Sequence, residues 1–281
     1  MSYMSFPLTR PGDTPRTAQP AWHVSAGDTI ATLGALTGLS LVTLLMTLTA
    51  AGFDDRMLYG ATVWAKPAKF AASFALFFAT LFLVAARLSD SVLRARTIRI
   101  ILAVLVTAFL YEIGYISLQA ARGVSSHFNF SSIASEIAFM LMGIGAVALM
   151  ICAGVIGVIA ARDREARLSP ELRSGVLHGF VWAAALTILV GGSISLTGGP
   201  VIGTPDTDAS VPLLGWSLAA GDQRVAHFLA LHAMQAGPLL GLAADRLGWR
   251  EKRVRQGMLG YAALTLIVWI QALAGYPLIP G

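Results

Sequence analysis

The stretch SIASEIAFMLMGIGAVALMICAGVIGVIAA, residues Ser132 to Ala161, decides the fold class of this chain. From Ile137 to its end it contains 25 residues without a charge. An α-helix rises about 1.5 Å per residue, so about 20 apolar residues are enough to cross the hydrocarbon core of a bilayer. The stretch is therefore predicted to be a transmembrane helix.

The composition of the whole chain agrees with this prediction. Of its 281 residues, 56% are hydrophobic and 12% are charged, and the mean hydropathy is +0.70. Soluble domains contain about 25% charged residues, so this chain has too little polar surface to face water on all sides. The single cysteine, Cys152, lies inside the quoted stretch, which excludes a disulfide within the chain and a cysteine-based zinc cluster.

Working outward from Ser132 to Ala161, six further apolar runs are long enough to span a bilayer. They extend from Thr29 to Ala51, Phe70 to Ala86, Ile98 to Gln119, Gly175 to Thr197, Arg224 to Ala244 and Met258 to Ile279. The predicted fold is an all-α, polytopic transmembrane bundle of seven helices, formed by residues 28–281 as one domain. Residues 1–27 are polar and contain four prolines, which predicts a mobile cytoplasmic tail.

The distribution of lysine and arginine predicts the orientation. With the N-terminus inside, 15 of the 20 basic residues lie on the cytoplasmic side and 5 on the outer side. Basic residues favour the cytoplasmic side of membrane proteins, so the C-terminus is predicted to lie outside. The same topology accounts for the net charge of +5 without a nucleic-acid partner.

Glu112 is the most informative single residue. It lies about two turns below the outer end of the third predicted span, where a carboxylate costs several kcal/mol unless it is paired, protonated or solvated. Tyr115 and Gln119 follow at i+3 and i+7 and extend a polar stripe along the same helix face. We assign Glu112 as a candidate catalytic or proton-accepting residue. The alternative is a structural pair with Arg122 or with a backbone donor.

The predicted topology also gathers histidines on the outer side. His127, His227 and His232, together with Glu136 at the start of the fourth span, form the candidate ligand set for a metal ion or haem. On a regular helix His227 and His232 point about 140° apart, so we expect His227 to join His127 and Glu136 while His232 serves other partners. Structural hydrogen bonding by these histidines is the alternative.

Lys66 and Lys69 flank Pro67 at the expected start of the second span. Free amide groups at such a helix start, with two cations beside them, favour an anion. We assign Lys66, Lys69 and Arg224 as candidate anion-binding residues. The alternative for the two lysines is anchoring at lipid headgroups, with Trp64 as an interfacial aromatic residue.

Three segments carry a family resemblance. They are Trp64-Ala-Lys-Pro-Ala-Lys-Phe70, Ser126-His127-Phe-Asn129 and Arg224-Val-Ala-His227-Phe. The chain resembles, over most of its length, a group of uncharacterised bacterial polytopic membrane proteins that share such segments. The resemblance implies a bacterial inner membrane location, with the lipid bilayer as surroundings, and no particular activity.

Three functions are compatible with these observations. The first is a metal- or haem-binding redox protein, and the second is an ion-coupled transporter of a small anionic solute, with Glu112 titrating. The third is an accessory subunit of a membrane complex or a homo-oligomer. In that case the small residues Gly143, Gly145, Gly154 and Gly157 would let helices of a partner approach closely.

Overall fold

The computed structural model describes residues 25–204 and 209–279 of the chain. The long helices are α1 (Ala26–Ala51), α2 (Ala65–Ala85), α4 (Arg96–Ala121), α5 (Ile133–Arg162), α6 (Pro170–Leu196), α7 (Gln223–Leu247) and α8 (Glu251–Leu273), and α3 (Asp90–Leu93) is a single short turn. Each of these seven long helices is long and apolar enough to cross a membrane. The predicted all-α class with seven spans is confirmed, whereas the predicted tail lies almost entirely outside the described residues.

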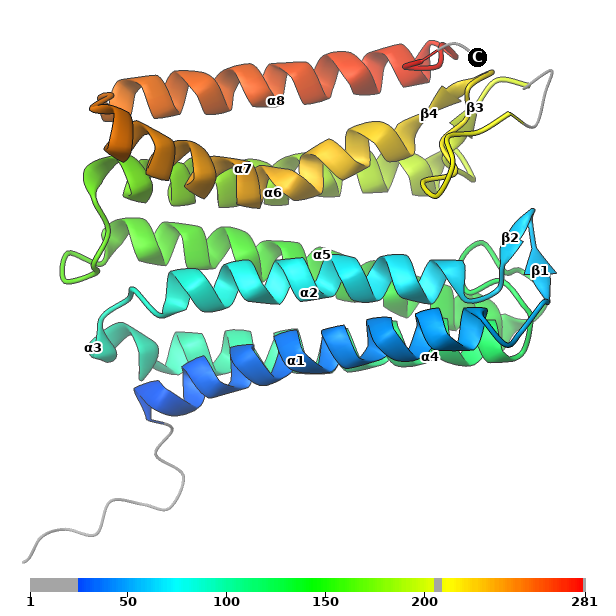
Figure 1. The fold of residues 1–281 in the computed structure, drawn as a ribbon, viewed down its shortest axis with the longest axis horizontal. Helices are drawn as coiled ribbons and strands as arrows, with labels where there is room; N and C mark the ends of the chain where they lie inside the picture. Colours follow the sequence, from blue (N-terminus) through cyan, green and yellow to red (C-terminus); the bar gives the residue numbers. More distant parts are fainter. Residues whose placement is uncertain (1–24, 205–208, 280–281) are drawn as a thin grey trace, which may run out of the picture.

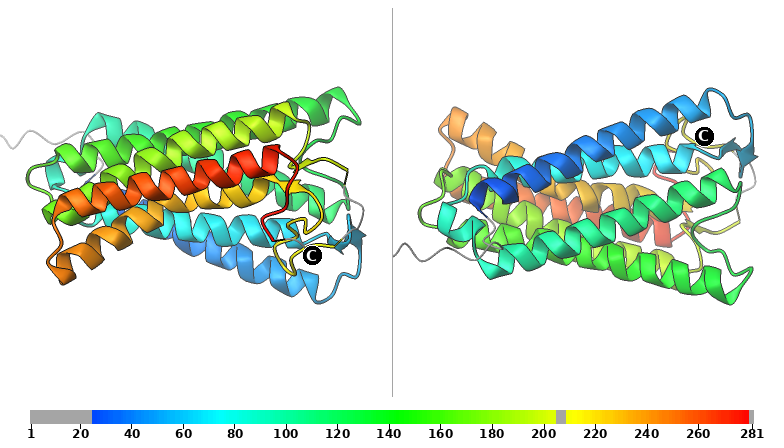
Figure 2. Two further views of the ribbon diagram at one scale, coloured as in Figure 1. Left: turned by 90° about the horizontal axis from the view of Figure 1, so that it is seen from above. Right: turned by 90° about the horizontal axis from the view of Figure 1, so that it is seen from below.

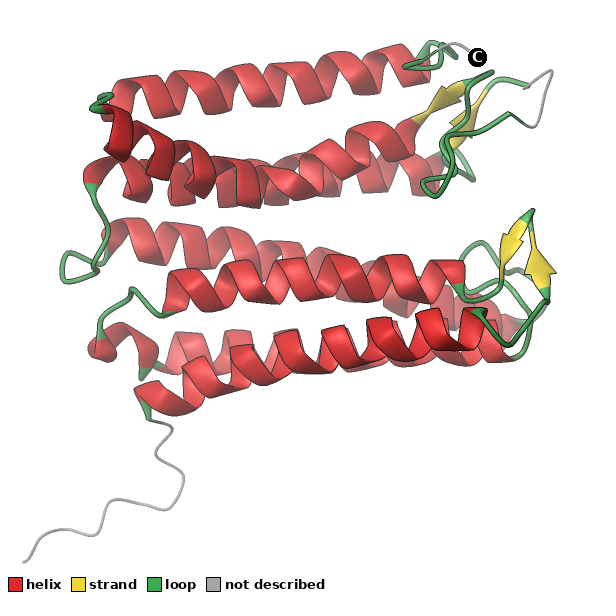
Figure 3. Cartoon of the chain, in the orientation of Figure 1, coloured by secondary structure: helices red, strands yellow, loops and turns green. Residues whose placement is uncertain are grey.

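The bundle has two distinct ends (Figures 1 and 3). One end, which we call the strand end, carries the antiparallel pairs β1 (Met57–Leu58) with β2 (Ala61–Thr62) and β3 (Val201–Ile202) with β4 (Gly221–Asp222). The opposite end, which we call the basic end, carries α3, the α5–α6 connection and the α7–α8 turn. Of the basic residues in the described ranges, 13 lie at the basic end and 5 at the strand end.

Chain neighbours pack side by side in this bundle. Helices α1, α2 and α4 contact one another, as do α6, α7 and α8, and α5 contacts both α4 and α6. Figure 2 shows α8 on one face of the bundle and α1 with α4 on the opposite face. A cluster of phenylalanines fills the interior between α2 and α4, where the Phe109 ring meets the rings of Phe74 and Phe78 edge-on at centroid distances of 5.0 and 5.1 Å.

The outer surface of the bundle is apolar along the length of the spans. On α1, Leu45 and Met46 are 67% and 66% exposed, and on α8 Ile267 is 61% exposed. In water such continuous exposure of large aliphatic side chains would be costly. The chain is a multi-pass integral membrane protein, and lipid covers these side chains.

Helices α6 and α7 make the closest contact of the bundle through glycine. A Cβ placed on Gly237 would overlap the carbonyl oxygen of Gly175, and one on Gly179 would lie 2.7 Å from that of Ala233. The two backbones therefore touch directly, as small residues permit between membrane helices. Past this contact α7 bends near its middle (Figure 1), and it carries Pro238, which removes one helical hydrogen bond.

The small residues of α5 serve packing within the chain. Gly154 and Gly157 face α6, where a Cβ would lie 3.1 Å from Ala184 and 2.6 Å from Phe180. Gly145 faces Glu112 of α4. Gly143 has no atom within 4 Å of such a Cβ, so among the four glycines it alone is open to another helix.

Three predicted helix starts need correction. The last helix begins at Glu251 and ends at Leu273, nearly two turns earlier at each end than the predicted Met258 to Ile279. The fifth span begins at Pro170 and not at Gly175. The second begins at Ala65, so Pro67 is its third residue and not its first. Proline is still tolerated there because the first four amide groups of a helix have no partner in the helix.

Candidate functional site

Glu112 lies inside the bundle, as its sequence position predicts. It is nine residues before the end of α4 at Ala121, about 14 Å below the strand end, and therefore close to the bilayer middle. The residue is 2% exposed, and its Oε1 atom has no hydrogen-bond partner among the described residues. Gly145 of α5 covers this oxygen, because a Cβ on Gly145 would lie 3.1 Å from it.

The charged group that acts on Glu112 is that of Lys66, in the first turn of α2. The two side chains interact electrostatically, but no ion pair within 4.0 Å joins them in the part of the chain that the structure describes. The Lys66 ammonium lies 6.0 Å from the centre of the Phe70 ring. An ammonium and a carboxylate thus interact through space without forming an ion pair.

His127 borders the same region from the α4–α5 connection. Its ring lies 5.7 Å from that of Phe70 and 5.6 Å from that of Phe139, measured between centres. Burial lowers the pKa of His127 to about 3, and the nearby positive charge of Lys66 contributes to the shift. His127 is therefore a neutral imidazole at physiological pH, with Ser126 Oγ 3.2 Å from its Nδ1 atom.

The polar stripe of α4 leads from Glu112 toward the strand end. Gln119, 2% exposed, donates a hydrogen bond of 3.0 Å to the Tyr115 hydroxyl. Arg122 donates to Gln119 Oε1 at 3.1 Å. Arg122 is thus engaged by Gln119 and does not form the structural pair with Glu112 considered above.

The predicted metal ligands do not converge. Among residues 25–204 and 209–279 no three His, Cys, Asp or Glu side chains are placed to hold one metal ion. Glu136 is exposed in the first turn of α5. The helix dipole is enough to favour an acid at such a position, without a bound metal ion. The expected grouping of His127, His227 and Glu136 as joint ligands therefore has no support among the described residues and stays a prediction.

His227 and His232 do serve different surroundings, as their spacing predicts. His227 faces Gly191 of α6, and its Nδ1 atom is buried without a hydrogen-bond partner in the described chain. His232 lies against Phe228, with ring centres 4.2 Å apart, and its Nδ1 is 3.2 Å from Gln235 Oε1. Gln235 in turn donates to Thr80 Oγ1 of α2 at 2.9 Å.

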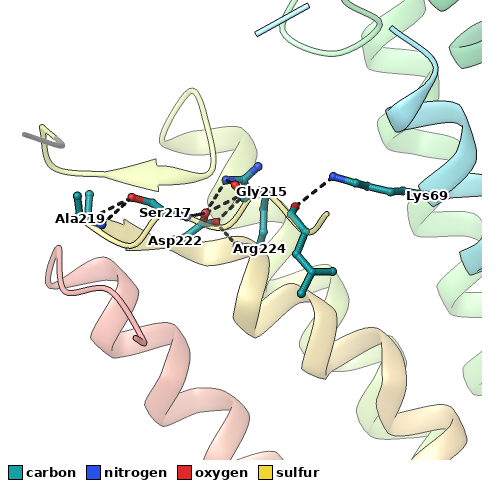
Figure 4. Close-up of polar contacts among 8 residues, drawn as sticks. Lys69, Gly215, Ser217, Ala219, Asp222 and Arg224 are labelled. Carbon is teal, nitrogen blue, oxygen red and sulfur yellow. Dashed lines mark hydrogen bonds and ion pairs between the residues drawn. The ribbon is translucent and has the colours of Figure 1, made fainter. Parts of the chain in front are cut away.

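The three predicted anion-binding residues separate into two places. Lys69 and Arg224 meet beside Gly215, and a Cβ built there would lie 3.9 Å from a terminal nitrogen of each (Figure 4). Lys69 donates to the Leu214 carbonyl at 3.1 Å and Arg224 to that of Gly215 at 2.6 Å, while Asp222 pairs with Arg224. Lys66 lies apart from them, beside Glu112.

Asp222 caps α7 by accepting the amide hydrogen of Arg224. Two features of the site escape sequence reasoning: the electrostatic interaction of Lys66 with Glu112, and the cover that Gly145 provides. Both depend on how α2, α4 and α5 are rotated against one another, which periodicity within one helix does not report.

Comparison of the chain with protein-family models, with curated proteins and with solved structures gives no match.

Proposed function

We propose that the chain couples the binding of a proton at Glu112 to the binding of a small anionic solute at Lys66, as an ion-coupled transporter. One observation carries this proposal: a carboxylate oxygen of Glu112 is buried near the bilayer middle and unpartnered among the described residues, and the ammonium of Lys66 interacts with it electrostatically without forming an ion pair. Ionisable residues at such a depth are costly and mark ion and proton pathways.

The arrangement links the two ligands through one positive charge. When Glu112 is ionised, its negative charge competes with an anion for Lys66. When Glu112 binds a proton, the competition ends and the charge of Lys66 is available to the anion. Proton and anion therefore favour each other's binding, as reciprocity between two sites requires.

Lys69 and Arg224 give this site an electrostatic approach. They lie nearer the strand end than Glu112 and bring two cations to the loop around Gly215, where Asp222 pairs with Arg224. Positive potential at the mouth of a path raises the local concentration of anions. Both residues hold backbone carbonyls, so their positions are fixed before an anion arrives.

The orientation belongs to the same proposal. The excess of arginine and lysine at the basic end supports a cytoplasmic basic end and an outer strand end. In a bacterial inner membrane the site would then open to the periplasm. Membership in the group of polytopic proteins with the Trp64–Phe70, Ser126–Asn129 and Arg224–Phe228 segments is likewise a proposal.

A metal- or haem-dependent redox function ranks below transport. Its candidate ligands are His127, His227, His232 and Glu136, and no group of three such side chains is placed to hold one metal ion in the described residues. An absorption spectrum and elemental analysis of protein purified without a histidine tag test it directly. A Soret band or a stoichiometric transition metal would reverse the ranking.

The transport proposal is tested by proton uptake on anion addition. Protein in lightly buffered detergent solution receives chloride, inorganic phosphate or acetate, and a pH dye records the protons bound. We expect about one proton per chain with an accepted anion, and loss of the signal in Glu112→Gln and in Lys66→Met. Glu136→Gln is the matched control and should retain it.

Gly145→Ala tests the same site without removing a charge. Its new Cβ would press on Glu112 Oε1, so proton uptake should fall, whereas Gly143→Ala, with open space around it, should behave as the unsubstituted chain. Uptake that persists in Glu112→Gln, or that disappears equally in Glu136→Gln, would contradict the proposal.

A further inference from the structure

The α7–α8 turn concentrates free positive charge at the basic end. Five cations occur between positions 246 and 255: Arg246, Arg250, Lys252, Arg253 and Arg255. Asp245 and Glu251 are the only acids from 245 to 255, so the segment carries a net charge of +3. None of the five cations forms an ion pair or donates a side-chain hydrogen bond to another described residue.

The turn is held in a defined shape. Gly248 ends α7 in the left-handed conformation, with φ +66°, and its amide donates to the carbonyl of Ala244. Val254 and Met258, 0% and 1% exposed, fix the first turns of α8 in the interior. The cations are therefore displayed from an ordered turn.

Apolar side chains lie among these charges. Leu247 is 61% exposed and Trp249 36% exposed, and the Arg253 guanidinium lies 5.7 Å from the centre of the Trp249 ring. Arg250, Lys252 and Arg253, together with Gly248 and Gln256, line a shallow depression beside them. Tryptophan beside basic residues at the end of a membrane helix is the pattern of the headgroup region, where rings rest near acyl chains and cations meet phosphates.

We propose that the α7–α8 turn is a binding site for an anionic phospholipid, whose phosphate sits in the depression lined by Arg250, Lys252 and Arg253 while its upper acyl chain contacts Leu247 and Trp249. Charge complementarity favours an acidic headgroup over a zwitterionic one, because juxtamembrane cations are attracted to an anionic lipid surface. The site is distant from Glu112 and independent of the transport proposal.

The first test compares lipids on the delipidated full-length protein in detergent. Phosphatidylglycerol should raise the apparent Tm by about 3 °C or more relative to phosphatidylcholine, because a ligand bound only to the folded state stabilises it. The triple variant Arg250→Gln, Lys252→Gln, Arg253→Gln should lose this shift. The matched control, Arg96→Gln, Arg162→Gln, Arg164→Gln, removes three charges from the same end and should keep it.

Three results would overturn the proposal. One is the absence of a phosphatidylglycerol shift in the unsubstituted chain. Another is an equal loss of the shift in both triple variants, which would show a diffuse charge effect. The third is an equal shift with inorganic phosphate that disappears in the first triple variant, since the site would then recognise a phosphate without its lipid.

A second measurement needs no change at the cations. Phosphatidylglycerol with brominated acyl chains should quench the fluorescence of Trp249, isolated as the difference between the unsubstituted chain and Trp249→Phe. Quenching should be at least about twofold stronger than with brominated phosphatidylcholine, as expected from local enrichment of the anionic lipid. Equal quenching by the two lipids would contradict the proposal even if the triple variant did not fold.

Discussion

A carboxylate in the sequence of a membrane span identifies a candidate functional residue more clearly than a carboxylate in a water-exposed segment does. Glu112 could be selected from sequence because its depth in an apolar run makes an unpaired charge costly, and the structure places it 2% exposed in the bundle. Its partner could not be selected. Lysine has a flexible four-carbon side chain that carries the ammonium several ångströms from its backbone, so the position of Lys66 at the start of α2 does not reveal that it interacts with Glu112.

His127 provides a pH dependence of stability. Its pKa in the folded chain is about 3, because of burial and the charge of Lys66, against an ordinary value of 6.5. Between these values the unfolded chain binds more protons, so the free energy of unfolding decreases as the pH falls from about 6.5 toward 3. We expect His127→Gln to have a flatter dependence than the unsubstituted chain.

The measurement is reversible unfolding in mixed micelles, followed by circular dichroism between pH 7 and pH 4.5. Glu112 and other titrating groups are common to both proteins, so the difference between the two curves isolates His127. Parallel curves would mean that the imidazole is solvated in the folded chain. The control variant is His178→Gln. His178 lies at the opposite end of the bundle, where its Nδ1 atom is hydrogen-bonded to the carbonyl of Ser174 in the same helix.

At the scale of the element, hydropathy locates membrane spans better than helix ends. Each of the seven apolar runs contains a long helix, but α8 extends through Glu251 to Arg255 before its apolar part begins. Charged residues favour helix as well as many apolar ones do, so the helix continues into the headgroup region, where hydropathy indicates a loop. Hydropathy therefore predicts which residues lie in lipid, but not the residues at which the helical hydrogen bonds begin and end.

The α6–α7 contact gives a prediction about helix packing. Gly237→Ala would place a methyl group on top of the Gly175 carbonyl oxygen, which forces the helices apart. We expect a loss of about 1–3 kcal/mol in the free energy of unfolding, the usual cost of overpacking. Unfolding in mixed micelles measures it.

Gly192→Ala is the matched control for that experiment. Gly192 also lies within α6, but nothing lies within 4 Å of the position that its new methyl group would occupy. Alanine favours helix over glycine by up to about 1 kcal/mol, so this variant should be as stable as the unsubstituted chain or more so. Equal destabilisation by both substitutions would show that α6 and α7 do not touch through Gly237.

For the whole molecule, the charge difference between the two ends predicts orientation. Reporter fusions after Arg173 should give a cytoplasmic signal and fusions after Gly281 an external one, because the basic end is expected to face the cytoplasm. Fusion of the same reporters after Arg122, in the α4–α5 connection at the strand end, supplies a second external point. The opposite signal at these sites would show that the bundle is oriented the other way, with the strand end in the cytoplasm.

The sequence is informative about which parts of the bundle lie at each end and less so about which helices touch. The spacing of His227 and His232 predicts that they point apart, and they do. Their partners, Gly191 on α6 and the Gln235–Thr80 pair with α2, depend on helix order around the bundle. Seven antiparallel spans with short connections allow many such orders, because each helix is apolar on nearly all sides.

The enclosure of Glu112 also bears on how the chain enters the membrane during synthesis. Spans emerge in order, so α2 and its Lys66 precede α4, and a positive charge is already at the membrane when the acid of α4 arrives. The glycine that covers Glu112 comes one helix later, on α5. If the helices pack in the order of synthesis, we expect a stage at which Lys66 is present but Gly145 does not yet cover Glu112, so that water or a proton accompanies Glu112 until α5 packs against α4.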